Sequence, residues 1–184
     1  MTLLELLVNR TSCSKLSAPA PDDDALRQII LAGLRAPDHG RLRPWRFVII
    51  EGDGLQRLGD LFAEAAARRT AVLDDAALLK FRQQPLRAPL IIAVIASPKS
   101  HAKIPEIEQY HSVACSAYAM LLAANAQGFA GIWRTGDNAY DAYINQQLGL
   151  EPHEQIIAYL HLGTSAGEAN PLPVVDPDNF ISRF

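Results

Sequence analysis

The chain has 184 residues, of which 49% are hydrophobic and 20% charged, and this composition is typical of one globular domain. A net charge of -3 argues against a nucleic-acid binder, and no apolar run is long enough to span a membrane. No secretory signal precedes the first helix, and the two cysteines, Cys13 and Cys115, lack metal-ligand spacing. We therefore expect a cytoplasmic protein with free thiols, and we expect Cys115 in the core.

The first helix should start at Thr2, because residues 2–5 have a capping-box pattern with Glu5 at the third helical position. The apolar residues 3–8 indicate a buried helix, which leads directly into the polar residues Arg10, Thr11 and Ser12. Arg10 offers a planar donor fork and its two neighbours offer hydroxyl groups, which suits a phosphate site. The same residues would also serve as a plain helix C-terminal cap, and both interpretations stay open.

Residues 16–21 should form a linker into a second helix, whose first turn carries Asp22, Asp23 and Asp24. Pro37 ends this helix, and residues 47–50 predict a buried strand. The loop between them is polar and anchored at both ends, so it is either a functional site or a solvated basic turn. Its conspicuous side chains are His39, Arg41, Arg43 and Trp45.

Helices are predicted over residues 55–65 and 74–84, followed by an apolar strand over residues 89–96 that suits the centre of a sheet. The longest helix should cover residues 106–127 and stop at Gly128. Its middle, residues 113–124, is apolar or small on nearly every side. A helix of this kind lies either in a dimer interface or in the core of one chain.

A strand that ends in a polar turn is predicted over residues 129–136, a short helix over 140–148, and a strand over 156–162. From about residue 164 the chain should be an extended, proline-rich arm that reaches Phe184. Helices and separated strands in this order indicate one domain, residues 1–184, with an α/β or α+β sandwich fold.

Three site motifs fail on inspection of the sequence. Gly52 and Gly54 lack the third glycine of a dinucleotide fingerprint, since Arg57 occupies that position. Residues 163–167 match a nucleophile elbow, but the last histidine is His161, so the order serine, aspartate, histidine cannot follow. The histidines are scattered, so no metal site is predicted.

Three stretches together resemble the nitroreductase family: residues 9–12, residues 35–39 with 44–47, and residues 127–129 with 131–134. The resemblance covers essentially the whole chain. It implies an α+β fold, an α-β-α sandwich with a central, mainly antiparallel sheet, in an intertwined homodimer that holds FMN in its interface. It also implies a hydride transfer from NAD(P)H to the flavin, then electron transfer to a nitroaromatic, quinone or similar small acceptor by a ping-pong mechanism.

The resemblance also assigns residues. Arg10, Thr11 and Ser12 would contact the FMN phosphate and ribityl chain, and Arg35 and His39 would contact the flavin of the partner subunit. The isoalloxazine side would be contacted by Trp133, Arg134 and Thr135. A segment for NAD(P)H would comprise Ala123, Ala124, Asn125, Ala126, Gln127 and Gly128.

The flavin would carry the chemistry, so no catalytic side chain is expected. The chain departs from the family at Arg41 and Arg43, where relatives often have neutral residues, and Arg183 has no clear counterpart among the phosphate-binding residues near the C-terminus. These departures leave the acceptor open. Two alternatives remain: a flavin-binding protein without turnover, such as a sensor or store, and a homodimer that has lost its cofactor.

Overall fold

A five-stranded sheet forms the centre of the computed structural model, which describes residues 2–70, 72–167 and 171–184. The strands run in the order β1-β5-β3-β2, with β4 paired to β5, and every pair among the described residues is antiparallel. Their bounds are Leu16–Ser17 for β1, Trp45–Glu51 for β2, Leu90–Ala96 for β3, Ala130–Arg134 for β4 and Gln155–Ser165 for β5. An antiparallel sheet covered by helices confirms the predicted α+β class.

Strand β3 lies at the centre, as its continuous apolar run predicted, and every one of its residues is buried. Its side chains alternate between two cores, as the period of a strand requires. Ile92 and Val94 belong to the core on one face of the sheet, whereas Ile91 and Ile95 belong to the core on the other.

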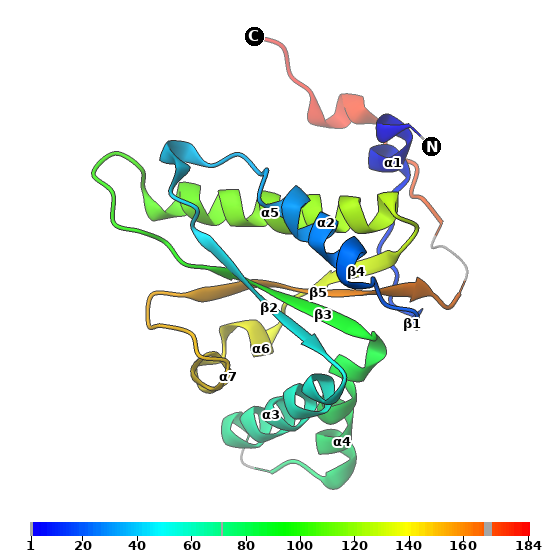
Figure 1. Ribbon diagram of the computed structural model, residues 1–184, viewed down its shortest axis with the longest axis vertical. Coiled ribbons are helices and arrows are strands. Elements are labelled where there is room, and N and C mark those ends of the chain that lie inside the picture. Colours follow the sequence, from blue (N-terminus) through cyan, green and yellow to red (C-terminus); the bar gives the residue numbers. More distant parts are fainter. Residues whose placement is uncertain (1, 71, 168–170) are drawn as a thin grey trace.

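Helices α2 (Asp23–Gly33) and α5 (Glu106–Ala126) cover one face of the sheet (Figure 1). Helix α2 starts where the predicted acidic turn lies, because the Asp22 carboxylate accepts the backbone N–H of Ala25 at 2.9 Å. The two helices approach closely at Gly33, where a Cβ atom would come within 2.6 Å of the Met120 side chain. One face of α5 is therefore fixed in the core.

The opposite face is covered by α3 (Asp53–Arg69), α4 (Asp75–Gln83), α6 (Asp137–Tyr140) and α7 (Ala142–Gln147) (Figure 1). The short helix predicted over residues 140–148 is found as α7, which starts two residues later than expected because the chain breaks between α6 and α7 at Asp141. The Asp141 carboxylate accepts the backbone N–H groups of Tyr143 and Ile144 and so caps a new helix. Its second oxygen pairs with Arg69 of α3, which holds the break in place.

The two termini lie at the same end of the molecule (Figure 1). Helix α1 (Leu3–Asn9) has the predicted capping box, with both Thr2 and Glu5 bonds present. It is not the buried helix that was expected, because Leu6 alone is buried while Leu3 is 70% exposed. Of the predicted arm, residues 164–165 still belong to β5, residues 168–170 lie outside the described part, and Pro177–Phe180 form a 3-10 turn.

Other differences follow from the position of each element. The expected linker contains β1, which pairs with Thr164 and Ser165. Strand β2 starts at Trp45 and is half-buried, because β3 is its only strand neighbour among the described residues. Cys115 is exposed, because it points from α5 away from the sheet, so its predicted core position is wrong. Among the described residues, no helix combines the length and apolar character needed to cross a membrane.

Candidate functional site

The segment after α1 lies against β4, so two of the three predicted site segments are neighbours. The backbone N–H of Cys13 donates to the carbonyl of Gly131 at 3.0 Å. Ser12 and Gly131 therefore lie near one another, although they are more than a hundred residues apart in the sequence. Arg10 ends α1, and its backbone N–H donates to Leu6 at 3.1 Å. Both interpretations of residues 10–12 are thus compatible with the structure, since Arg10 ends the helix through its backbone and leaves its side chain available.

A cavity of about 570 Å³ opens beside this segment. It lies open between the end of α1 and the C-terminal arm, and its lining residues are Val8, Arg10, Thr11, Ser12, Pro171, Leu172, Pro173 and Val175. Arg10 is the only ionisable residue in this lining. A single guanidinium with two hydroxyl groups, set against apolar walls, is suited to a ligand with one phosphate and an apolar body.

The side chains of β4 point to opposite faces of the sheet. Gly131 and Trp133 face α5, since Gly131 approaches Leu121 and Trp133 packs against the core on that side. Arg134 lines a second cavity on the other face, together with Arg87. Burial and then the neighbouring charge of Arg87 lower the pKa of Arg134. Because neighbouring residues of a strand point to opposite faces, the Arg134 side chain lies on the face of the sheet away from α5. Thr135 is exposed just beyond the end of β4.

The second cavity also contains His161, which was considered in the sequence only as the last histidine. Burial lowers its pKa to about 4, so the imidazole is neutral at pH 7. Its Nδ1 lies 3.3 Å from the carbonyl oxygen of Tyr159. Arg87 was not predicted either. His161 could have been found from the alternation of side chains along β5, which places residues 159 and 161 on one face of the sheet, beside the end of β4.

Arg35 and His39 are both exposed in the loop that follows α2. Arg35 lies near the middle of α5, because Gly33 approaches Ser116 and Met120. Asp38 organises this loop, because its carboxylate accepts the N–H groups of Leu42 at 3.2 Å and Arg43 at 2.7 Å. Gly40 lies near Ile104, just before α5 begins, whereas Gly131 lies near Leu121 toward its end. The 21 residues of α5 rise about 30 Å. One chain therefore does not bring His39 to Arg10.

Residues 123–128, which the family resemblance assigns to NAD(P)H, form the last turn and the C-terminal cap of α5. The Asn125 side-chain amide donates to the carbonyl of Phe129 at 2.8 Å, and that of Gln127 donates to Ala123 at 3.1 Å. Gly128 has a φ of +86°, which glycine adopts without strain. These polar side chains hold the helix end, and the alanines provide space beside it.

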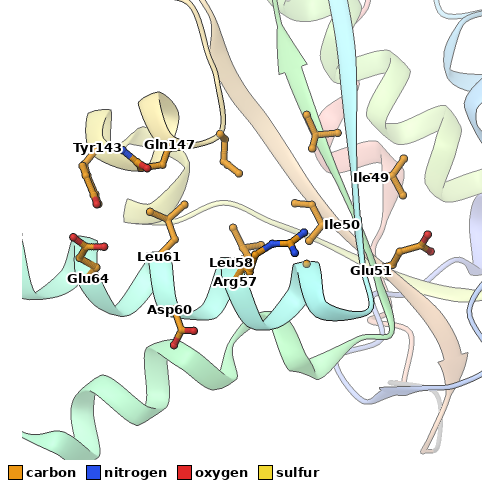
Figure 2. Close-up of a pocket in the computed structure, with 13 residues that line it drawn as sticks. Ile49, Ile50, Glu51, Arg57, Leu58, Asp60, Leu61, Glu64, Tyr143 and Gln147 are labelled. Atoms are coloured by element: carbon orange, nitrogen blue, oxygen red, sulfur yellow. The ribbon is translucent and has the colours of Figure 1, made fainter.

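A third cavity, of about 570 Å³, lies between β2, α3 and α7 and was not expected from the sequence (Figure 2). Its walls include Ile50 and Leu61, and its carboxylates outnumber its single cation, Arg57. The acidic residues are Glu51, Asp60 and Glu64. This charge disfavours a phosphate, so a nucleotide does not suit this cavity. No cluster of three or more metal-ligating side chains occurs within residues 2–70, 72–167 and 171–184.

Comparison with known proteins agrees with this architecture. The model of the nitroreductase family matches residues 7–164. The chain is 42% identical, over 185 residues and the full length of both proteins, to the Escherichia coli (strain K12) protein named "Putative NAD(P)H nitroreductase YdjA". A 35% identical relative from Haemophilus influenzae, named "Putative NAD(P)H nitroreductase", is covered over 99% of both chains.

Solved structures give the same fold. A nitroreductase-like family protein from Bacillus cereus superimposes with a TM-score of 0.85 at 18% identity, over 100% of this chain and 96% of the other. A mutant of the FMN and NADPH-dependent nitroreductase NfnB, from sphigopyxis sp. strain HMH, gives 0.79 at 19% identity, over 100% and 99%. The expected nitroreductase-like α-β-α sandwich is confirmed. By its family match and its full-length relatives, the chain belongs to the nitroreductase family.

Proposed function

We propose that the protein is an FMN-dependent oxidoreductase that takes hydride from NAD(P)H and reduces a nitroaromatic, a quinone or a similar small acceptor. The observation that carries this proposal is the junction of Cys13 and Gly131, which places β4 next to the segment that holds Arg10 and lines a cavity. Membership of the nitroreductase family supports it, as does the name of NfnB, which describes that protein as FMN and NADPH-dependent. The free thiols of Cys13 and Cys115 support a cytoplasmic location.

The residues at this cavity fit the phosphate of FMN, and residues at the end of β4 line the second cavity. Arg10, Thr11 and Ser12 would bind the phosphate, and Trp133 and Thr135 would contact the isoalloxazine side. The contact of Arg134 would come from its main chain, because its side chain lies on the opposite face of the sheet. FMN, when bound, would accept the hydride and pass electrons on. The chain itself would need only to hold the cofactor and leave one face open, which agrees with the lack of an acid–base motif in the sequence.

We propose further that the active form is a homodimer whose two sites are each shared between chains. Arg35 and His39 would contact the flavin of the partner, and His39 lies far from Arg10 in one chain. The exposed apolar side chains support such a dimer, because a lone chain would leave them in water. They occur on α1, α5 and the C-terminal arm, and include Leu3, Leu4, Val8, Ile107, Tyr118, Val174, Phe180 and Phe184.

NAD(P)H and the acceptor would use the same open face of the cofactor in turn. The sequence contains no separate dinucleotide fingerprint, and residues 123–128 would at most border the nicotinamide nucleotide. Steady-state rates with both substrates varied test this point. Parallel double-reciprocal lines would support one shared site with ping-pong kinetics, whereas intersecting lines would show that both substrates bind together.

The proposal as a whole is tested by the absorbance spectrum of the purified protein. We expect a yellow protein that releases FMN on denaturation, loses its flavin absorbance with NADPH in the absence of oxygen, and regains it when a nitroaromatic is added. Release of FAD, or no flavin after reconstitution, would overturn the cofactor assignment. A yellow protein that neither NADH nor NADPH reduces would indicate flavin binding without turnover.

A further inference from the structure

Two loops at the N-terminal end of α5 carry a basic patch that the proposed flavin contacts do not explain (Figure 1). One loop follows α2 and contains Arg41 and Arg43, and the other follows β3 and contains Lys99 and Lys103; all four residues are exposed. We propose that these four residues bind the 2′-phosphate of NADPH, so that the enzyme prefers NADPH to NADH. This inference rests on the proposed function, because it names the hydride donor of the same site.

The first argument is that the two loops are held side by side. At one end, the backbone N–H of Ser97 donates to the carbonyl of Pro44 at 2.7 Å. At the other end, Gly40 lies against Ile104, since a Cβ atom on Gly40 would come within 2.5 Å of the Ile104 side chain. The basic residues of both loops are thereby brought to one part of the surface, where a single phosphate can meet side chains from two segments.

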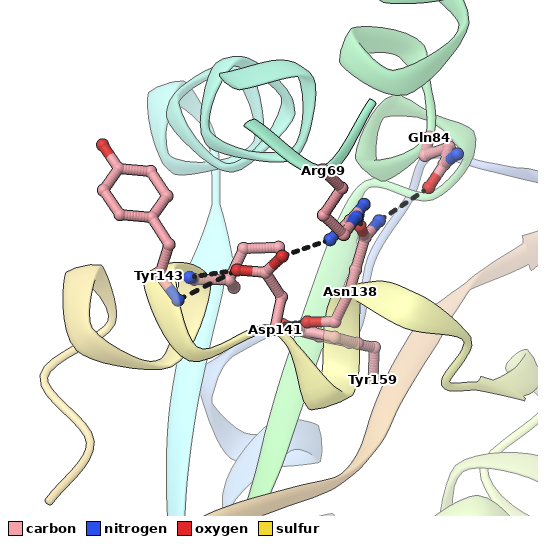
Figure 3. A network of polar contacts seen from close by, with 7 residues as sticks. Arg69, Gln84, Asn138, Asp141, Tyr143 and Tyr159 are labelled. Carbon is pink, nitrogen blue, oxygen red and sulfur yellow. Dashed lines mark hydrogen bonds and ion pairs between the residues drawn. The ribbon is translucent and has the colours of Figure 1, made fainter. Parts of the chain in front are cut away.

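The second argument is charge. None of the four basic residues of the patch has an ion-pair partner among the described residues, whereas Arg69 on α3 is paired with Asp141 (Figure 3). The carboxylate within the loops, that of Asp38, is already engaged, because it accepts the backbone N–H groups of Leu42 and Arg43. The patch is therefore open to an anion, and a phosphate monoester, with its nearly double charge, gains most from several free cations.

The third argument is that the backbone of the lysine loop is fixed before any ligand binds. The side-chain amide of buried Gln109 accepts the backbone N–H of Lys99 and donates to the carbonyl of the same residue, both at 2.8 Å. The backbone N–H of Lys103 donates to Nδ1 of His101 at 3.2 Å. A loop that is already ordered loses less conformational entropy on binding, which favours a specific site over a merely attractive surface.

The fourth argument selects the anion. By the family resemblance, His39 of the first loop would contact the flavin of the partner, so the patch would border the place where the dinucleotide meets that flavin. NADH and NADPH differ only in the 2′-phosphate, which an arginine accommodates in other dinucleotide sites. An extended polyanion such as a nucleic acid suits this surface less, because the chain has a net charge of -3 and Glu106 and Glu108 begin α5 beside the patch.

The experiment titrates adenosine 2′,5′-bisphosphate and, separately, AMP into the purified protein, with any flavin it carries, by calorimetry. The bisphosphate has the 2′-phosphate of NADPH, which AMP lacks. We expect the wild type to bind the bisphosphate about tenfold or more tightly than AMP, and the double variant Lys99→Gln with Lys103→Gln to lose this preference. The matched control, Arg57→Gln with Lys80→Gln, removes two exposed charges from α3 and α4 and should keep the preference.

A second measurement separates this inference from the proposed function. The ratio of kcat/KM for NADPH to kcat/KM for NADH should fall about tenfold or more in the lysine double variant, and it should match the wild type in the control. Equal binding of the two nucleotides by the wild type, or a preference that persists in the lysine variant or disappears in the control, would overturn the inference and leave the oxidoreductase proposal intact. Absence of turnover with either dinucleotide would overturn the proposed function, while calorimetry would still decide whether the patch binds the 2′-phosphate.

Discussion

Arg46 of β2 donates two hydrogen bonds to the carboxylate of Glu154, the residue before β5: Nε to Oε1 at 2.8 Å and Nη2 to Oε2 at 2.6 Å. The Glu154 side chain is only 4% exposed, and it also accepts the backbone N–H of Glu151 at 3.0 Å. The bonds from Arg46 outweigh the effect of burial and lower the pKa of Glu154 to about 2. This pair ties the edge strand β2 to a turn more than a hundred residues away in the sequence.

Glu154→Gln should therefore destabilise the protein at neutral pH. A carboxyl whose pKa is lower in the folded state contributes stability above its unfolded pKa of about 4.5, and this contribution disappears as the pH falls toward 2. The loss should be about 3 kcal/mol at pH 7 and small near pH 2. Urea unfolding at several pH values measures it. The control is Glu64→Gln, which removes an exposed ion pair with Arg68 and should change the free energy of unfolding little. Equal losses of unfolding free energy in both variants would contradict the prediction.

Arg10→Ala should weaken FMN binding. A charge-assisted hydrogen bond contributes about 1.5–3 kcal/mol, which corresponds to roughly tenfold to over a hundredfold in affinity. Titration of the apoprotein with FMN measures the change. Arg27→Ala, an exposed arginine on α2, is the control and should bind as the wild type does. Unchanged affinity in Arg10→Ala would reassign this residue to the end of α1 alone.

These predictions depend on how far the sequence specifies the structure. Local patterns predicted the capping box at Thr2, the burial of β3 and the stop of α5 at Gly128, because each depends on residues close in sequence. The break at Asp141 depends on Arg69, which no local pattern reveals. Likewise, the periodicity of β4 placed Trp133 and Arg134 on opposite faces without saying which face carries a cavity.

For the proposed dimer we predict that Tyr118→Glu produces monomers. Tyr118 is 40% exposed on the face of α5 that points away from the sheet, so a buried charge there would oppose association. Sedimentation at micromolar protein is the measurement, and Lys80→Glu on α4 is the control. FMN affinity should fall with the dimer, since Arg35 and His39 would no longer reach the partner's site. A monomer that retains FMN and activity would contradict the shared site.

Arg41 and Arg43 should set the acceptor preference. Both are exposed, and both have positive φ values, of 54° and 50°, in the loop held by Asp38. We expect slow turnover of simple neutral nitroaromatics and faster turnover of anionic ones, which the two cations attract. The double variant Arg41→Gln with Arg43→Gln should lower kcat/KM for a nitrobenzoate about tenfold more than for nitrobenzene, and added salt should have the same effect. An equal change in kcat/KM for both acceptors would mean that the two arginines do not discriminate between anionic and neutral acceptors.

The complete burial of β3 has a consequence for measuring the stability of the whole chain. Its backbone groups are paired with β2 on one side and β5 on the other, and helices cover both of its faces. No local opening exposes the middle of such a strand, so its amide protons exchange with solvent only when the molecule unfolds globally. The slowest exchange rate, expected around Ile92 to Val94, would therefore report the global free energy of unfolding without denaturant.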